Sequence, residues 1–347
     1  VLYDSTPEIR EVPPARRKRV TNNYQLGMTE LLQASLTNAA QQYGKLLKLV
    51  PTAAKALGTA ATVMADQRTP KGERSLTLGL APKSIFNESI TNQRSYSTLS
   101  LPMADIKALG RRVGGTINTI VMAMSSIALE RFLAERGLLP RKALIAMVPV
   151  SLRSEGDDAM NNQVSMVRVD LATDITDLSE RFKAIHASSE AAKAVVRELK
   201  PVLGVDVPVT GSPWFMTGLA AFIGRSNLVG RFPAAGNVLI SNVPGYPEAL
   251  YVAGARMAHY YPLSIPYHGS GVNITVQSYA GLLEFGITAC RRILSQEESY
   301  EMVGYLRDAL SAIEALPSVD ETPVEPAPPP PEKPPKAARG KARSTKA

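Results

Sequence analysis

The chain has few of the side chains on which most metal and thiol sites are built. Its 347 residues include one cysteine, Cys290, which excludes an internal disulfide framework and fits a reducing cytoplasm. The three histidines, His186, His259 and His268, lie far apart, so no two of them are neighbours in sequence. We therefore expect no metal site, and we interpret Cys290 as a small buried side chain because no activating group adjoins it.

Three further absences narrow the class of protein. No dinucleotide fingerprint or phosphate loop occurs, because Gly269-Ser270-Gly271 lacks the glycine spacing and the lysine that those motifs need. Apolar runs such as residues 219–223 fall far short of the roughly 20 residues that span a bilayer. The start also lacks a signal-peptide pattern. We expect neither a nucleotide cofactor nor a transmembrane helix.

The basic charge is concentrated at the two ends of the chain. Of a formal net charge of +8, residues 1–19 contribute five basic and three acidic side chains, and residues 317–347 contribute six and four. Aromatic residues make up only 6% of the chain and do not interleave with these basic residues. The pattern argues against a nucleic-acid partner and favours contact of the ends with anionic lipid headgroups.

Composition divides the chain into three parts. Residues 1–83 predict a connector followed by one or two helices between residues 24 and 64, leading to a lobe outside this chain. Residues 84–316 predict one folded lobe. Residues 317–347 contain nine prolines among scattered charged residues and cannot bury enough apolar surface to order.

Helices and strands alternate within residues 84–316, which predicts an α/β fold. Strands are expected at 97–101, 144–150, 167–171 and 238–243, and an apolar helix or buried loop at 214–223. Thr116 is a predicted helix N-cap, while Asp177 with Glu180 and Ser295 with Glu298 form capping-box patterns. The helix that follows Asp177 is expected to reach Leu199.

Residues 260–292 couple an irregular loop to a predicted hairpin. Val272, Ile274 and Val276 alternate with polar residues, a turn follows at Tyr279–Leu282, and the alternation resumes with Leu283, Phe285 and Ile287. The hairpin makes the sheet mixed rather than purely parallel. We expect one face of this hairpin to pack and the other to be available for chemistry.

Together with Ser241-Asn242-Val243-Pro244-Gly245 and the segment 148–153, Val-Pro-Val-Ser-Leu-Arg, this hairpin resembles the bacterial wax ester synthase/diacylglycerol acyltransferase family over roughly residues 80–316. The resemblance implies the two-lobed fold of CoA-dependent, chloramphenicol acetyltransferase-like acyltransferases, with a mixed sheet flanked by helices. That family carries a catalytic signature, His-His-x-x-x-Asp-Gly, which does not occur in this chain.

The resemblance also implies what the parent protein does. It would transfer a long-chain acyl group from acyl-CoA, used as a substrate, to diacylglycerol or a fatty alcohol, without a metal or redox cofactor. The opening residues 2–7 resemble the segment that follows the signature, so we expect the catalytic base in a preceding N-terminal lobe and no catalytic residue in this chain. The alternative is a non-catalytic lipid-binding or scaffold module derived from that fold.

Polar residues near turns and strand ends are the candidates for binding substrate or supporting the site: Asn118, Ser151, Arg153, Asn242, Pro244, Gly245, His268 and Asn273. Asn273 can offer its amide to a developing oxyanion, or it can tether the preceding loop. His268 fits either a polar site or a structural histidine. The same two interpretations apply to His259, whereas His186 is expected to pack on a helix.

Ser151 and Arg153 follow a predicted buried strand, from whose end side chains can reach a cleft. Arg153 can meet the phosphates or adenine of CoA, or it can pair with a nearby carboxylate such as Glu155. No Gly-x-Ser-x-Gly elbow surrounds Ser151, which argues against a serine nucleophile.

Asn242, Pro244 and Gly245 either face the site or organise a turn. Asn118 lies at a helix entrance where the family usually has Asn followed by Asp, and Thr119 replaces that Asp. Asn118 can bond across the lobes or serve the start of the helix. The predicted location is cytoplasmic, at a membrane or lipid-droplet surface.

Overall fold

A mixed six-stranded sheet organises the computed structural model, which describes residues 3–8, residues 27, 29, 30, 33 and 37, and the ranges 80–151, 164–203 and 234–319. The strand order is β1-β8-β7-β4-β2-β3. The pairs β2/β4 and β4/β7 are parallel and the others antiparallel, which confirms the expected mixed sheet. The strands are β1 (Arg94–Pro102), β2 (Ile145–Ser151), β3 (Val164–Asp170), β4 (Val238–Val243), β7 (Val272–Tyr279) and β8 (Leu282–Cys290).

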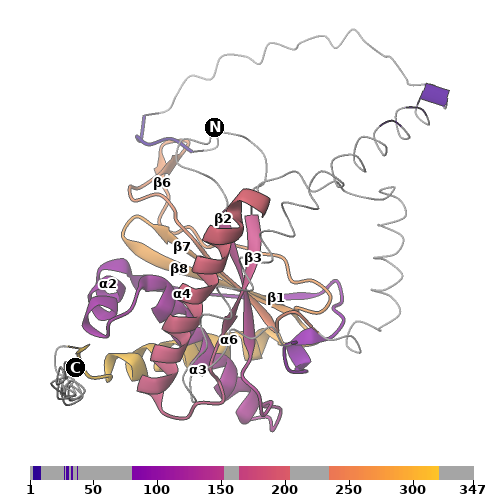
Figure 1. Ribbon diagram of the computed structural model, residues 1–347. Helices are drawn as coiled ribbons and strands as arrows, with labels where there is room; N and C mark the ends of the chain where they lie inside the picture. Colours follow the sequence, from indigo (N-terminus) through magenta and orange to yellow (C-terminus); the bar gives the residue numbers. More distant parts are fainter. Residues whose placement is uncertain are drawn as a thin grey trace, which may run out of the picture.

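Outside this sheet, β5 (Tyr251–Val252) and β6 (Ala255–Arg256) form a small separate hairpin. The helices are η1 (Ile85–Asn87), α2 (Met103–Arg112), α3 (Ile117–Ala134), α4 (Leu178–Leu203) and α6 (Gln296–Glu314). Figure 1 shows α3, α4 and α6 gathered against the sheet. The predicted segments 24–64 and 214–223, the residue Arg153 and the tail beyond 319 lie wholly or almost wholly outside the described residues.

One face of the sheet packs against the helices. Ser95 and Ser97 of β1 donate hydrogen bonds from their hydroxyls to the carbonyls of Leu294 and Ser299, at the start of α6. Fully or nearly fully buried apolar side chains continue this face across the other strands, among them Ile287, Ile274, Ile240 and Val148. This apolar layer is the core of the lobe.

Local sequence signals explain where the helices begin. Thr116 caps α3 and Ser295 caps α6 in a capping box with Glu298, as predicted. Thr116 also forms a capping box with Thr119, which the sequence pattern did not predict. The Asp177 carboxylate accepts a hydrogen bond from the Glu180 amide at 2.8 Å. The expected end of α4 at Leu199 is wrong: the helix continues to Leu203, two residues past Pro201.

Helix α3 lies at the centre of the core. By length and composition alone it would be apolar enough to cross a membrane, yet two thirds of it (67%) is buried inside the lobe. Its side chains at Ile120, Val121, Phe132 and Leu133 have no exposed surface. The apolar character of α3 is therefore explained by packing on all sides.

The hairpin of β7 and β8 closes through a tight turn. Ala280 and Gly281 have φ angles of 45° and 84°, as expected of a two-residue turn that matches the twist of its strands. The predicted turn at Tyr279–Leu282 is confirmed. The expectation that only one face of the hairpin packs is wrong, because Asn273, Thr275 and Glu284 on the other face are also buried.

A buried pair of asparagines joins distant segments of the lobe. The Asn237 amide oxygen accepts from the Ile145 amide at 2.9 Å, and its nitrogen donates to the Pro82 carbonyl and the Asn87 side chain at 2.7 and 2.8 Å. The Asn87 nitrogen donates to the carbonyls of Gly236 and Gly269. The network ties the segment before β1 to the starts of β2 and β4.

We predict that Asn237→Ala destabilises the chain by about 3 kcal/mol, because three buried polar groups lose their partner. Urea unfolding of the intact chain measures this change. The matched control is Asn92→Ala at an exposed position, expected to stay within about 0.5 kcal/mol of wild type. Equal stabilities of the two variants would contradict the role given to the network.

Candidate functional site

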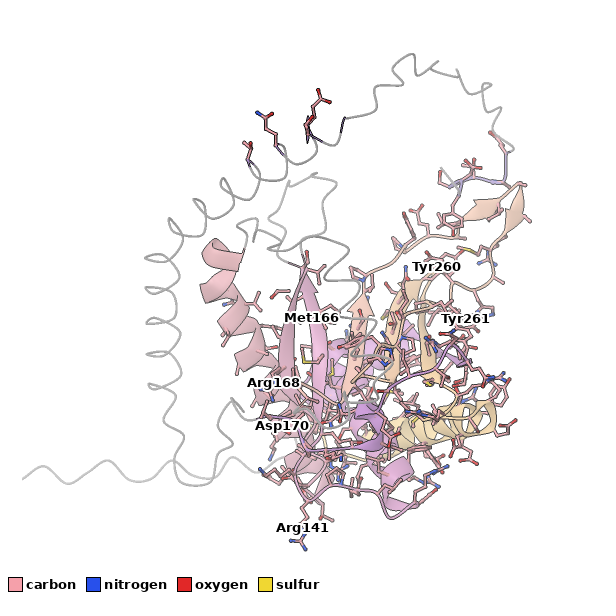
Figure 2. All side chains as sticks on the ribbon, turned by 90° about the vertical axis from the view of Figure 1, so that its right-hand side faces the viewer. Arg141, Met166, Arg168, Asp170, Tyr260 and Tyr261 are labelled. Atoms are coloured by element: carbon pink, nitrogen blue, oxygen red, sulfur yellow. The ribbon has the colours of Figure 1, made fainter. Side chains whose placement is uncertain are left out.

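The sheet face opposite the helices, called the open face below, carries a group of polar side chains. Register places Ser100 of β1, Glu284 of β8 and Gln277 of β7 side by side, and Thr288 beside Asn273. Figure 2 shows Met166, Arg168 and Asp170 in a row along β3 at the far edge of the sheet. Burial lowers the pKa of the Arg168 guanidinium. The open face is thus chemically distinct from the apolar helix face.

Residues 259–264, called the strap below, cross the open face over β1, β8 and β7. The Tyr96 hydroxyl donates to the Pro262 carbonyl at 3.1 Å, and the Ser264 amide donates to Thr288 Oγ1 at 3.4 Å. Gly286 lies beneath the strap, where an added Cβ would come within 1.8 Å of the Pro262 oxygen. The close approach of the strap therefore requires glycine at position 286.

A chain of hydrogen bonds runs from the strap into the sheet. Ser264 Oγ bonds Thr275 Oγ1 at 2.5 Å, and Thr275 Oγ1 donates to Asn273 Oδ1 at 2.9 Å. Asn273 is 3% exposed, so this chain is shielded from solvent. Because its oxygen is an acceptor here, the orientation of the Asn273 amide is set by the strap.

A second set of contacts pins the other end of the strap. His259 Nδ1 lies 2.9 Å from Oε1 of Glu284, whose side chain has no exposed surface. Ser100 Oγ donates to Glu284 Oε2 at 2.5 Å and bonds the Tyr261 hydroxyl at 2.8 Å. Burial, with Tyr261 and Glu284 adding to it, raises the pKa of Tyr96.

The structure does not bring the predicted site residues into one cluster. Asn273 lies under the strap, whereas Ser151 is an exposed residue at the carboxyl end of β2. Through β4 register, Ser151 lies level with Val243 and Gln277, roughly 13 Å along the strands from Asn273. Arg153 is outside the described residues.

Asn242 shares the helix face with Ile240 and Val276, so it points away from Asn273. Pro244 and Gly245 follow β4 directly, and the Gly245 amide donates to the Ser278 hydroxyl at 2.9 Å. An added Cβ at Gly245 would lie 1.9 Å from the Ser278 carbonyl oxygen. This turn is therefore fastened to the end of β7 by close backbone contact.

The remaining candidates have contacts elsewhere in the lobe. The Asn118 amide donates to Ser189 Oγ of α4 at 3.0 Å, and Thr119 Oγ1 lies 3.0 Å from His186 Nδ1, so both residues fasten α3 to α4. His268 is exposed and accepts a hydrogen bond from the Ile90 amide at 3.2 Å. These contacts hold helices and loops in place.

Cys290 is fully buried at the end of β8, as expected. Burial raises the pKa of its thiol, but hydrogen bonds from Thr91 and Arg292 together with the charge of Arg94 outweigh burial, and the net direction is downward. Within the described ranges, no group of three His, Cys, Asp or Glu side chains is arranged to hold a metal ion.

Two family models match the chain in separate stretches. The wax ester synthase/diacylglycerol acyltransferase catalytic domain matches residues 1–121, and the C-terminal domain of the same family matches residues 160–314. The chain belongs to this family. Strand β1 lies in the first match and β8 in the second, so the two family segments share one sheet in this member of the wax ester synthase/diacylglycerol acyltransferase family.

Similar proteins carry consistent names. A putative diacylglycerol O-acyltransferase of Mycobacterium tuberculosis is 35% identical over 74% of this chain and 51% of its own length. The O-acyltransferase WSD of Acinetobacter baylyi is 32% identical over 68% of this chain and 50% of its own length. The chain therefore spans about half the length of these curated relatives.

Solved structures confirm the fold class. A wax ester synthase/diacylglycerol acyltransferase from Marinobacter aquaeolei VT8 superposes with a TM-score of 0.52 at 27% identity, covering 77% of this chain and 56% of that chain. The expected CoA-dependent acyltransferase-like lobe, a mixed sheet with helices, is thereby confirmed. The predicted boundary between residues 83 and 84 stays a prediction, and the catalytic-domain match runs past it.

Sequence reasoning missed the most buried polar residue of the open face. The sequence pattern indicates Glu284 only as one polar position in an alternating strand, and it does not indicate a contact between Glu284 and His259. The available signal was a carboxylate between Leu283 and Phe285, two core residues of the same strand. A carboxylate so placed needs a partner wherever its face of the sheet is covered.

We predict that Gly286→Ala displaces the strap and destabilises the chain by about 2 kcal/mol, because the added Cβ overlaps the Pro262 carbonyl. Limited proteolysis within residues 257–267, together with urea unfolding, measures both effects. The matched control is Gly304→Ala on α6, where no atom lies within 4 Å of the added Cβ. That variant should gain about 1 kcal/mol from helix propensity. Unchanged proteolysis in Gly286→Ala would contradict the close approach.

Proposed function

We propose that this chain is the C-terminal portion of an O-acyltransferase that moves a long-chain acyl group from acyl-CoA to diacylglycerol or a fatty alcohol. The products would be triacylglycerol or wax ester and free CoA. The observation that carries this proposal is the match of both family domains, catalytic and C-terminal, to one chain. The catalytic-domain match favours an enzyme over a non-catalytic lipid-binding module.

Ester formation sets three requirements for such a protein: a base for the alcohol proton, a donor that stabilises the oxyanion, and apolar surface along which the acyl chain lies. The alcohol oxygen attacks the thioester carbonyl, a base takes the hydroxyl proton, and the CoA sulfur leaves as the carbonyl re-forms. The resemblance assigns the base to a segment before Val1. A thioester is already activated for this transfer, so we propose that no metal or redox cofactor takes part.

The open face suits the remaining two requirements. Asn273 Oδ1 is engaged by Thr275, which leaves its Nδ2 as the group that would donate to an oxyanion. Apolar side chains are exposed on the same side, with Leu263 at 72% and Ile265 at 80%. We propose that they form part of the wall along which an acyl chain lies, since apolar chains are favoured against apolar surface.

The location proposed for the parent protein is cytoplasmic, peripheral to a membrane or lipid droplet. Its substrates partition into lipid, and the basic ends of the chain suit an anionic headgroup surface. Flotation with anionic liposomes tests this placement. No nucleic-acid partner is proposed.

We predict that the complete parent protein releases free CoA from palmitoyl-CoA in the presence of hexadecanol or diacylglycerol, and forms the matching ester. Denaturing mass analysis first establishes which polypeptides the preparation contains. If a preparation that includes the N-terminal lobe releases no CoA with either acceptor, the proposed activity is wrong. If this chain without that lobe released CoA, the base would have to lie within it.

We predict that Asn273→Ala in the complete protein lowers kcat by about 100-fold, with the KM for acyl-CoA within about threefold, because an oxyanion donor acts only in the transition state. Steady-state kinetics with palmitoyl-CoA measures both constants. Asn92→Ala is the matched control and should leave both unchanged. A rise in KM at constant kcat would instead indicate a role in binding.

A further inference from the structure

A buried carboxylate is the fixed point of the strap. Glu284 has no exposed side-chain surface, yet both of its oxygens are engaged, one by His259 Nδ1 at 2.9 Å and the other by Ser100 Oγ at 2.5 Å. The Ser100 hydroxyl in turn bonds Tyr261, and the His259 ring stacks on the Tyr261 ring at 5.2 Å with an interplanar angle of 9°. Two strap residues thus converge on one side chain of β8.

The described residues that neighbour Glu284 in the sheet are uncharged. Its neighbours in register are Ser100 on β1 and Gln277 on β7. Burial raises the pKa of Tyr96, and its phenol lies close enough for the Glu284 carboxylate to raise that pKa further. His259 Nδ1 is the hydrogen-bond partner of Glu284 Oε1, and 46% of the His259 side chain is exposed. Removing either side chain therefore leaves the other without this hydrogen-bond partner.

A carboxylate is a costly way to fill this position. Burying a carboxylate gives up hydration that its hydrogen bonds only partly restore, and an apolar residue of similar size often serves stability as well or better. Leu283 and Phe285, on either side of Glu284 in β8, point to the opposite face of the sheet and belong to the apolar core there. What a carboxylate adds is direction, because it accepts bonds only from donors placed at its two oxygens.

By fixing the position of the strap, Glu284 also affects the hydrogen bonds that run from Ser264 through Thr275 to Asn273. His259 and Tyr261 are held at one end of the strap, and Ser264 meets Thr275 and Thr288 at the other. Pro262 lies between them, with its carbonyl oxygen close against Gly286. A strap released at His259 would no longer hold Ser264 at bonding distance from Thr275.

We propose that Glu284 is a positioning residue, which holds the strap through His259, Ser100 and Tyr261 so that the Ser264, Thr275 and Asn273 chain is preformed for acyl transfer. The catalytic part of this inference rests on the proposed function. The placement part does not, because it concerns contacts within this chain. The two parts are therefore tested by separate measurements on the same variants.

Hydrogen–deuterium exchange of the intact chain tests the placement. Glu284→Gln and His259→Leu should each raise the exchange rates of strap amides, Ser264 among them, by about tenfold, while α3 amides stay as in wild type. The double variant should exceed either single variant by less than about twofold, because both changes remove one coupled interaction. Glu314→Gln, which removes an exposed carboxylate at the end of α6, is the charge-matched control.

Several results would overturn the placement. Strap exchange within about twofold of wild type in both single variants would show that the pair does not hold the strap. Equal acceleration in α3 and in the strap would show that Glu284 serves global stability. Because nearly half of the His259 side chain is exposed, His259→Leu keeps the test decisive even if Glu284→Gln fails to fold.

Kinetics of the complete parent protein tests the catalytic part. Glu284→Gln and His259→Leu should lower kcat by about 10 to 100-fold, with the KM for palmitoyl-CoA within about threefold, because a misplaced donor costs rate more than binding. A strap that exchanges faster with kcat unchanged would overturn the link to acyl transfer. A wild-type protein that releases no CoA would refute the proposed function, while the exchange result still decides the placement.

Discussion

Hydrogen-bond satisfaction on the open face of the sheet is the constraint on which the rest of the lobe depends. Burying a hydroxyl, amide or carboxylate without a partner costs several times what the finished hydrogen bond contributes. The open face carries Asn273, Thr275 and Glu284 in buried positions, and the strap brings the donors and acceptors that satisfy them. Gly286 permits this by leaving space for the strap backbone.

The same constraint explains why the two sides of the sheet differ so sharply. The helix face is filled with apolar side chains, and its serines Ser95 and Ser97 bond directly to the start of α6. The open face presents polar groups beneath and apolar groups above, since Leu263 of the strap and Ile265 directly after it are exposed. This layering fits the proposed thioester substrate, whose reacting carbonyl is polar and whose acyl chain is not.

Much of the fold could be predicted from sequence, because the relevant signals are local. The alternation in β7 and β8, the capping boxes at Thr116 and Ser295 and the strand at 238–243 each depend on neighbours within a few residues. The covering of the second face could not be predicted in this way. It depends on a contact between His259 and Glu284, 25 residues apart, that no periodic pattern records. Asn242 and Asn273 similarly lie on opposite faces of the sheet. This follows from the register between β4 and β7, which the sequence around each asparagine does not reveal.

The pairing of β1 with β8 also determines how this lobe can be assembled during synthesis. Tyr96 and its partner Gln296 at the start of α6 are separated by 200 residues, so most of the chain is made between them. At about 5–20 residues per second, β1 leaves the ribosome about 10 to 40 s before its partner exists. Until β8 has been synthesised, the unpaired β1 can pair with another strand or chain and aggregate. The hydroxyls at Ser95, Ser97 and Ser100 make β1 less hydrophobic than β8, the strand that it joins, which reduces that hazard.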